Sequence, residues 1–77
     1  MNKQEKTGYV NQLSRYLSNP SAAQERYEAG DFDGSLEEYT QQLQELADQL
    51  AQEDFDDKDA LCQQVKILHL PSEQFNC

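Results

Sequence analysis

The residues in this sequence that are best suited to chemistry are carboxylates, and they are concentrated in one segment. Residues 27–57 contain eleven of the fifteen acidic residues and no Lys or Arg, so this segment is more negative than the whole chain, whose net charge is −9. Carboxylates in such numbers can bind a divalent cation, transfer protons as acid–base pairs, or attract a basic partner. The spacing of the residues distinguishes between these chemistries.

Residues 31–34, with the sequence D-F-D-G, fit part of a calcium-binding EF-hand loop, in which acids at two alternate positions precede a glycine. The same register places Ala29 at the first position of the loop and Thr40 at the last, where that loop carries carboxylate ligands. A second acidic cluster, residues 53–59, is better explained as a charged loop that caps a helix. The sequence therefore predicts no metal site.

Support for catalysis is weak. His69 is the only histidine and follows Cys62 on the same expected helix, about 10 Å away by helical rise, which is too far for direct activation of the thiol. With 36% hydrophobic residues, the chain has few side chains to wall a pocket that would raise the pKa of a carboxyl group. The P-loop and G-x-S-x-G motifs are absent. We predict that the protein is not an enzyme and uses no cofactor.

The two cysteines, Cys62 and Cys77, form neither a C-x-x-C pair nor a four-ligand zinc set. The chain has no N-terminal apolar segment and no apolar run that approaches the roughly 20 residues needed to span a bilayer. These features predict reduced cysteines in a soluble, cytoplasmic protein. An intermolecular disulfide through Cys77 is the alternative.

The strongest structural signal is a helix over residues 35–52. Its apolar face is formed by Leu36, Tyr39, Leu43, Leu46 and Leu50, which are three and four residues apart. Ser35 and Glu38 match a capping box at its start, and the remaining positions are polar. The stripe covers little more than two heptads, so we expect it to close the core of the domain, with a homodimer seam as the alternative.

Further helices are predicted over residues 8–18, 20–29 and 57–69. Pro20 suits the first turn of the second helix, Gly30 suits its C-terminal end, and Pro71 stops the last helix. His69 lies near that last end, where a cation interacts favourably with the helix dipole. The fold class is therefore all-α, a small bundle of three main helices plus one short helix. We expect one domain over residues 1–77, with a frayed N-terminus (1–7) and a C-terminal tail (72–77).

Residues 25–39 resemble the turn between the two helices of a tetratricopeptide repeat. The positions that match are Ala23, Gly30, Asp31, Phe32, Leu36 and Tyr39, and Ser35 stands where a small alanine is usual. Asn19, Gln42 and Ala47 stand where the repeat has an aromatic, a small residue and a proline. The resemblance implies a helix–turn–helix unit and, through the family, a protein-binding role. Because such repeats stack in arrays of at least about three, we interpret the resemblance as a recurrent helix–turn–helix geometry and not as membership of the family.

Charge and fold class together predict a small acidic protein-binding module, acting as a regulator, inhibitor or assembly adaptor. The partner is a protein with a basic patch, with no direct binding to nucleic acid or membrane, and the chain is a monomer or weak homodimer. The expected contact residues are Asp31, Asp33, Glu37, Glu38, Glu45, Asp48, Glu53, Asp54, Asp56 and Asp57, with Phe32 or Phe55 as an apolar anchor. The alternatives are a DNA mimic that inhibits a nucleic-acid-binding protein and a homo-oligomeric structural protein that uses the Leu36–Leu50 stripe.

Overall fold

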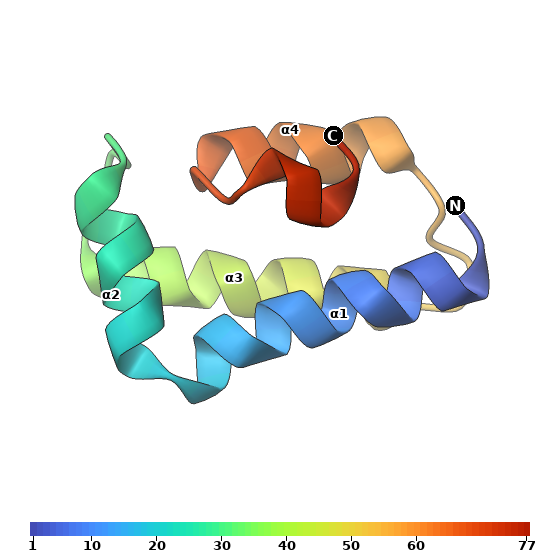
Figure 1. The fold of residues 1–77 in the computed structure, drawn as a ribbon, viewed down its shortest axis with the longest axis horizontal. Coiled ribbons are helices and arrows are strands. Elements are labelled where there is room, and N and C mark those ends of the chain that lie inside the picture. The colour runs from blue at the N-terminus through green and yellow to red at the C-terminus, as the bar shows by residue number, and fades with distance from the viewer.

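The chain forms four α-helices and no strand in a computed structural model that describes residues 1–77. The elements are α1 (Lys3–Ser18), α2 (Pro20–Ala29), α3 (Leu36–Ala51), α4 (Lys58–Ile67) and a terminal 3₁₀ helix, η1 (Ser72–Phe75). Three helices lie along the length of the molecule, and α2 stands across one end (Figure 1). The predicted all-α bundle of three main helices and a short one is confirmed.

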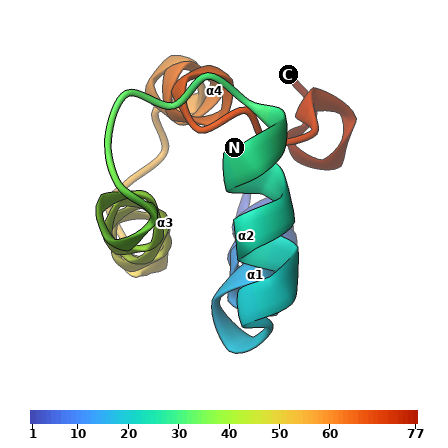
Figure 2. The same ribbon diagram turned by 90° about the vertical axis from the view of Figure 1, so that its left-hand side faces the viewer.

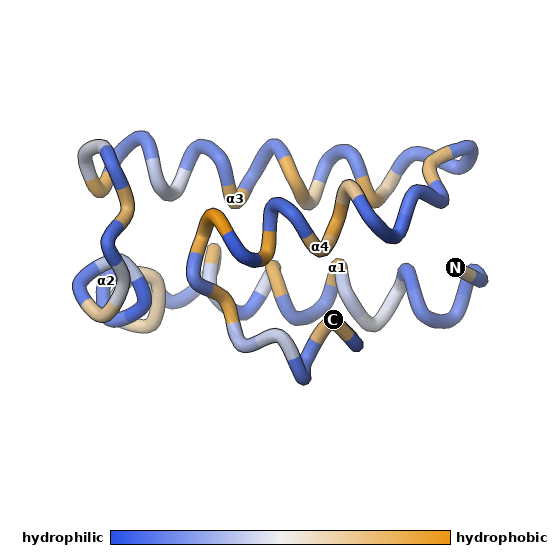
Figure 3. Tube along the Cα trace, turned by 90° about the horizontal axis from the view of Figure 1, so that it is seen from above, coloured by the Kyte–Doolittle hydropathy of each residue, from blue (hydrophilic) through white to orange (hydrophobic).

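The three lengthwise helices alternate in direction. α3 runs antiparallel to α1, and α4 then runs back above the two (Figures 1 and 2). Seen from above, α4 lies between α1 and α3 (Figure 3), and its residues Leu61 and Val65 are buried. η1 packs against α4 and α1, so the end of the chain closes the remaining side of the bundle.

The core consists of thirteen buried residues, all of them apolar or aromatic. Every element contributes to it, and the members are Tyr9, Leu13, Ala23, Tyr39, Leu43, Leu46, Ala47, Leu50, Leu61, Val65, Leu68, Leu70 and Phe75. The stripe on α3 is almost entirely inside, since Tyr39, Leu43 and Leu50 are at most 1% exposed. The stripe therefore closes the core of the chain itself, as the sequence predicted.

Tyr39 is the central residue of an aromatic cluster in the part of the core near α2. Its ring makes edge-to-face contacts with Tyr27 and Phe32, at centroid distances of 5.7 and 5.1 Å. Its buried hydroxyl donates a 2.6 Å hydrogen bond to the Leu68 carbonyl at the end of α4. Burial raises the pKa of Tyr39 from 10.0 to about 12, against the smaller opposing influence of the Arg26 cation. The native state therefore holds this phenol in its neutral form.

The raised pKa predicts a loss of stability in alkali. Between pH 10 and about 12, Tyr39 ionises in the unfolded chain but stays neutral in the folded protein. The contribution of this group to the free energy of unfolding is therefore fully present below pH 10 and is lost as the pH rises toward 12. The loss from this group is expected to be on the order of 2 kcal/mol. Urea unfolding of wild type and Tyr39→Phe at pH 8 to 11.5 measures it. The variant should show the shallower pH dependence, and equal slopes would contradict the assignment.

Helix α1 begins earlier than the sequence pattern indicated. Residues 3–7, expected to be frayed, form its first turns. The start is fixed by a capping box in which the Asn2 side chain accepts from the Glu5 N–H at 2.8 Å and the Glu5 carboxylate accepts from the Asn2 N–H at 3.2 Å. Two otherwise unpaired backbone donors are thereby satisfied. The apolar spacing alone did not reveal this start, because residues 3–7 are polar.

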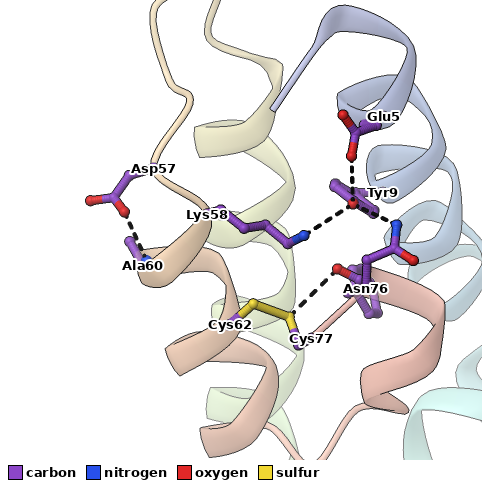
Figure 4. The surroundings of a disulfide bond; sticks show 9 residues. Glu5, Tyr9, Asp57, Lys58, Ala60, Cys62, Asn76 and Cys77 are labelled. Carbon is purple, nitrogen blue, oxygen red and sulfur yellow. Dashed lines mark hydrogen bonds between the residues drawn. A yellow bond between two sulfur atoms is a disulfide. The ribbon is translucent and has the colours of Figure 1, made fainter.

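The C-terminal tail is part of the core. Phe75 is fully buried and packs against the Tyr9 ring at a centroid distance of 5.8 Å. Asn76 then adopts a left-handed conformation (φ 55°) and donates a 2.9 Å hydrogen bond to the Tyr9 hydroxyl. This turn redirects the last residue toward α4 (Figure 4).

The expectation of free thiols is wrong. Cys62 on α4 and Cys77 form a disulfide within the chain, with their Cα atoms 5.6 Å apart. The physical reason is the burial of Phe75, which anchors the tail beside α4 and brings Cys77 within reach of Cys62 (Figure 4). The sequence contained no short-range signal for this pairing, because the two cysteines are fifteen residues apart.

Candidate functional site

The outer face of α3 carries the carboxylates that the sequence singled out. Glu37, Glu38, Glu45 and Asp48 are all exposed. At about 100° per residue they occupy an arc of roughly 100° on the side opposite the buried leucines. Gln41 and Gln52 lie on the same face and are also exposed, so the charge is diluted with amides. This face is available to a partner without any change in the core.

The turn before α3 holds two further carboxylates, those of Asp31 and Asp33, in exposed positions. Between them, the Phe32 ring packs against Tyr27 and Tyr39. The Tyr27 hydroxyl donates a 2.8 Å hydrogen bond to the Gly34 carbonyl. The aromatic contacts thus fix the turn from inside.

Gly34 is required at the end of this turn. Its φ of 156° lies in a region that side chains rarely adopt, and a Cβ there would be 2.6 Å from the Glu38 carboxylate and 2.8 Å from the Phe32 ring. The Ser35 side chain accepts from the Glu38 N–H at 3.2 Å, as predicted. The reciprocal half of the capping box is absent, because the Glu38 carboxylate lies against Gly34 instead.

The turn is also tied to the end of α4 through His69. The His69 Nε2 accepts a 3.3 Å hydrogen bond from the Asp31 N–H, and the His69 carbonyl accepts a 2.8 Å bond from Arg26 Nη2. His69 itself has a left-handed backbone (φ 54°) one residue beyond the helix cap. Two bonds, His69 N–H to the Lys66 carbonyl and Leu70 N–H to the Val65 carbonyl, complete a Schellman motif there.

Gly30 makes the closest approach in this junction and supports a stability prediction. A Cβ at Gly30 would lie 2.4 Å from the His69 ring, so Gly30→Ala is expected to cost about 1–3 kcal/mol by overpacking. Gly8 is the matched control, since it lies in α1 with open space around it, and Gly8→Ala should stabilise by up to about 1 kcal/mol. Thermal unfolding of both variants measures these effects, and a Gly30→Ala protein as stable as wild type would contradict the packing described.

The loop after α3 carries the remaining carboxylates. Glu53, Asp54, Asp56 and Asp57 are exposed, and the Asp57 side chain accepts from the Ala60 N–H at 3.1 Å to cap α4. The last turn of α3 contains no basic residue. Lys6 from α1 supplies the missing cation, because its ammonium group donates to the carbonyls of Gln52 and Glu53. This contact favourably neutralises the negative end of the helix dipole.

All ten predicted carboxylates are therefore exposed. Four lie on the outer face of α3 and six in the loops at its two ends, and we call this set the carboxylate strip. The sixteen residues of α3 extend about 24 Å, so the strip follows most of the 31 Å length of the molecule. Phe32 and Phe55 are half-buried in loops at opposite ends of α3. They cannot act together as a single anchor.

Sequence reasoning missed a groove beside one end of this strip. It has a volume of about 830 Å³ and lies between the start of α1 and the loop after α3. Val10, Leu50 and Phe55 contribute apolar surface to it, while Lys3 lies on one side and Glu53, Asp54 and Asp56 on the other. The groove is formed by two segments about forty positions apart in the sequence, which no local pattern connects.

Cys62 has no thiol in this structure, because it is bonded to Cys77. No group of three or more His, Cys, Asp or Glu side chains is placed to hold a metal ion. None of the helices combines the length and apolar character required to cross a membrane.

Comparison with known protein families, with curated proteins and with solved structures found no match for this chain.

Proposed function

We propose that the protein is a small protein-binding module that presents the carboxylate strip of α3 and its loops to a basic patch on its partner. The observation that supports this proposal is the exposure of all ten carboxylates, none of which is part of the buried core. The role would be that of a regulator, inhibitor or assembly adaptor.

The carboxylates of the strip are largely uncommitted within the chain. Asp48 accepts a 3.0 Å bond from Gln44 and Asp57 caps α4, and both of these contacts lie on the surface. Their charge therefore remains available to an outside cation. A strip of one sign along a small molecule accelerates encounter with an oppositely charged surface, and this effect weakens as salt screens it.

Phe55 is the better placed of the two proposed anchors. The Phe32 ring is occupied by Tyr27 and Tyr39, whereas Phe55 lines the groove beside Glu53, Asp54 and Asp56. An apolar side chain of the partner entering this groove would be flanked by the carboxylates of the loop on one side and by Lys3 and Lys6 of α1 on the other. Interface energy commonly depends on a few such buried anchors surrounded by a polar rim.

Charge reversal on α3 tests the proposal. The triple variant Glu37→Lys, Glu45→Lys, Asp48→Lys is expected to reduce capture of a partner from the native cell by at least about tenfold. The matched control reverses Glu25, Glu28 and Glu73, which are exposed and lie outside the strip, and so changes the net charge equally. Equal capture by the two variants would show that the strip is not the binding surface.

A DNA mimic is the more specific alternative, in which the strip occupies the nucleic-acid-binding site of the partner protein. Its support is the run of eleven acids without a base in residues 27–57, while the glutamines on α3 reduce the likeness to a phosphate ladder. Duplex DNA should displace the partner if this alternative holds. Failure of DNA to compete, together with binding that is indifferent to salt, would exclude it.

A homo-oligomer built on the Leu36–Leu50 stripe is disfavoured, because Leu43 and Leu50 already fill the core. Sedimentation at high micromolar concentration should give a monomer or a weakly associating dimer. A stable oligomer would favour the structural role instead.

A cytoplasmic location stays part of the proposal, and the disulfide makes it testable. Disulfides persist mainly in oxidising compartments. Alkylation of the protein immediately after cells are lysed in acid should modify Cys62 and Cys77 if they are reduced in the cytoplasm. Resistance to alkylation would place the protein in an oxidising compartment.

A further inference from the structure

A second cavity, of about 580 Å³, shares no lining residue with the groove near the N-terminus. It is open to solvent and is bounded by the end of α2, the second half of α4 and the tail, with Cys62 and Cys77 of the disulfide among its lining residues. Its volume falls within the range of about 300–1,000 Å³ that is typical of small-molecule sites. The carboxylate strip does not contribute to it.

Basic side chains gather in this cavity although the protein is strongly acidic. Arg26, Lys66 and His69 all line it, together with the Ser72 hydroxyl. The acidic residues of the chain contribute no side chain to its wall. The charged side chains that line the cavity are therefore all basic, in a molecule whose net charge is −9.

Arg26 shows that this positive charge is not matched within the chain. The residue is half-buried, its Nη2 donates to the neutral carbonyl of His69, and its enclosed Nε has no hydrogen-bond acceptor. Guanidinium groups removed from water are normally paired with carboxylate or phosphate oxygens. An anion in the cavity would balance the charge of the guanidinium group, although not through a bond to Nε, which has no surface open to solvent.

His69 adds an imidazole to the cavity wall. Its Nε2 accepts from the Asp31 N–H, which leaves Nδ1 as the nitrogen that carries hydrogen in the neutral ring. The left-handed backbone of His69, where glycine is the common choice, holds the residue between α2 and α4. A guanidinium, an ammonium, an imidazole and a hydroxyl thus come from three separate segments of the chain.

The rest of the cavity wall is apolar. Ala29, Val65, Leu70 and the disulfide present apolar surface. Two permanent cations balance a dianion better than a monoanion, and a tetrahedral phosphate can accept from donors in several directions. We propose that this cavity binds a small organic molecule that carries a phosphate group, with the phosphate at Arg26 and Lys66 and the organic part on the apolar wall.

The test is titration of the intact, oxidised protein with phenyl phosphate, followed by amide and arginine side-chain NMR shifts. Saturable shifts at Arg26, Lys66 and His69 are expected. Lys66→Gln should weaken binding roughly tenfold or more, since hydrogen bonds to charged groups are strong. Lys3→Gln, which removes the same charge at the far end of the molecule, should leave the affinity within about twofold of wild type.

Two ligand controls separate the possible sources of binding. Inorganic phosphate should bind more weakly than phenyl phosphate, because it cannot use the apolar wall, and phenylacetate should bind more weakly because it is a monoanion. Equal affinity for either control ligand would overturn the assignment to a phosphorylated organic molecule. Absence of saturable shifts, or equal losses in Lys66→Gln and Lys3→Gln, would overturn the site itself, and neither result bears on the carboxylate strip.

Discussion

Replacing Phe75 with alanine is expected to lower the free energy of unfolding by roughly 3–5 kcal/mol. Phe75 is fully buried and in contact with Tyr9, so its loss removes apolar burial and leaves a cavity between η1 and α1. A domain of this size has a stability near the lower end of about 5–15 kcal/mol, so much of the variant protein should be unfolded.

Urea unfolding followed by far-UV circular dichroism measures this effect. Ile67→Ala is the matched control, because Ile67 is 51% exposed and its truncation should change stability by no more than about 0.5 kcal/mol. A Phe75→Ala protein that unfolds at the same urea concentration as Ile67→Ala would show that the tail is not packed into the core.

Removing the disulfide by the double change Cys62→Ser, Cys77→Ser is the second prediction with a large effect. The bond closes a loop across fifteen positions, which in the chain-entropy account corresponds to about 3 kcal/mol of stability. Because the bond fastens the tail to α4, amide hydrogens of residues 72–77 should lose protection from exchange earlier than those of α3.

Reduction of the wild-type protein should reproduce the behaviour of the double variant, and the same reductant should leave the double variant unchanged. Hydrogen exchange and urea unfolding in the presence and absence of reductant supply the comparison. A reduced protein that keeps both its stability and the protection of its tail would contradict the structural role assigned to the disulfide.

Local signals predicted the middle of the fold well. The leucine spacing gave α3, and Pro20 and Gly30 gave the limits of α2, which the structure places at Pro20 and Ala29. The start of α1 was missed because it has polar residues and no apolar period. Asn2 and Glu5 were the available signal, since they form a capping box at the required spacing.

The tail could not be derived from local pattern. Phe75 contacts Tyr9, and Asn76 donates to the same tyrosine from sixty-seven positions away. Such contacts leave no periodic trace in the sequence. The only hint of the disulfide was that the chain contains two cysteines, and that number alone does not distinguish paired from free thiols.

The candidate surface was partly within reach of sequence reasoning. The exposure of Glu37, Glu45 and Asp48 follows from the period of α3, because positions opposite a buried stripe face water. The groove beside Phe55 and the contact of Lys6 with the Gln52 carbonyl depend on how α1 packs against α3. Those features required the three-dimensional arrangement.

The most direct measurement is the footprint of the captured partner on the isotopically labelled protein by NMR. The predicted result is a set of amide shift changes on the outer face of α3 and its two loops, centred on Glu37, Glu45 and Asp48 and diminishing with added salt. Shift changes confined to α1, α2 or the tail, with the α3 face unperturbed, would contradict the proposal that the carboxylate strip binds the partner.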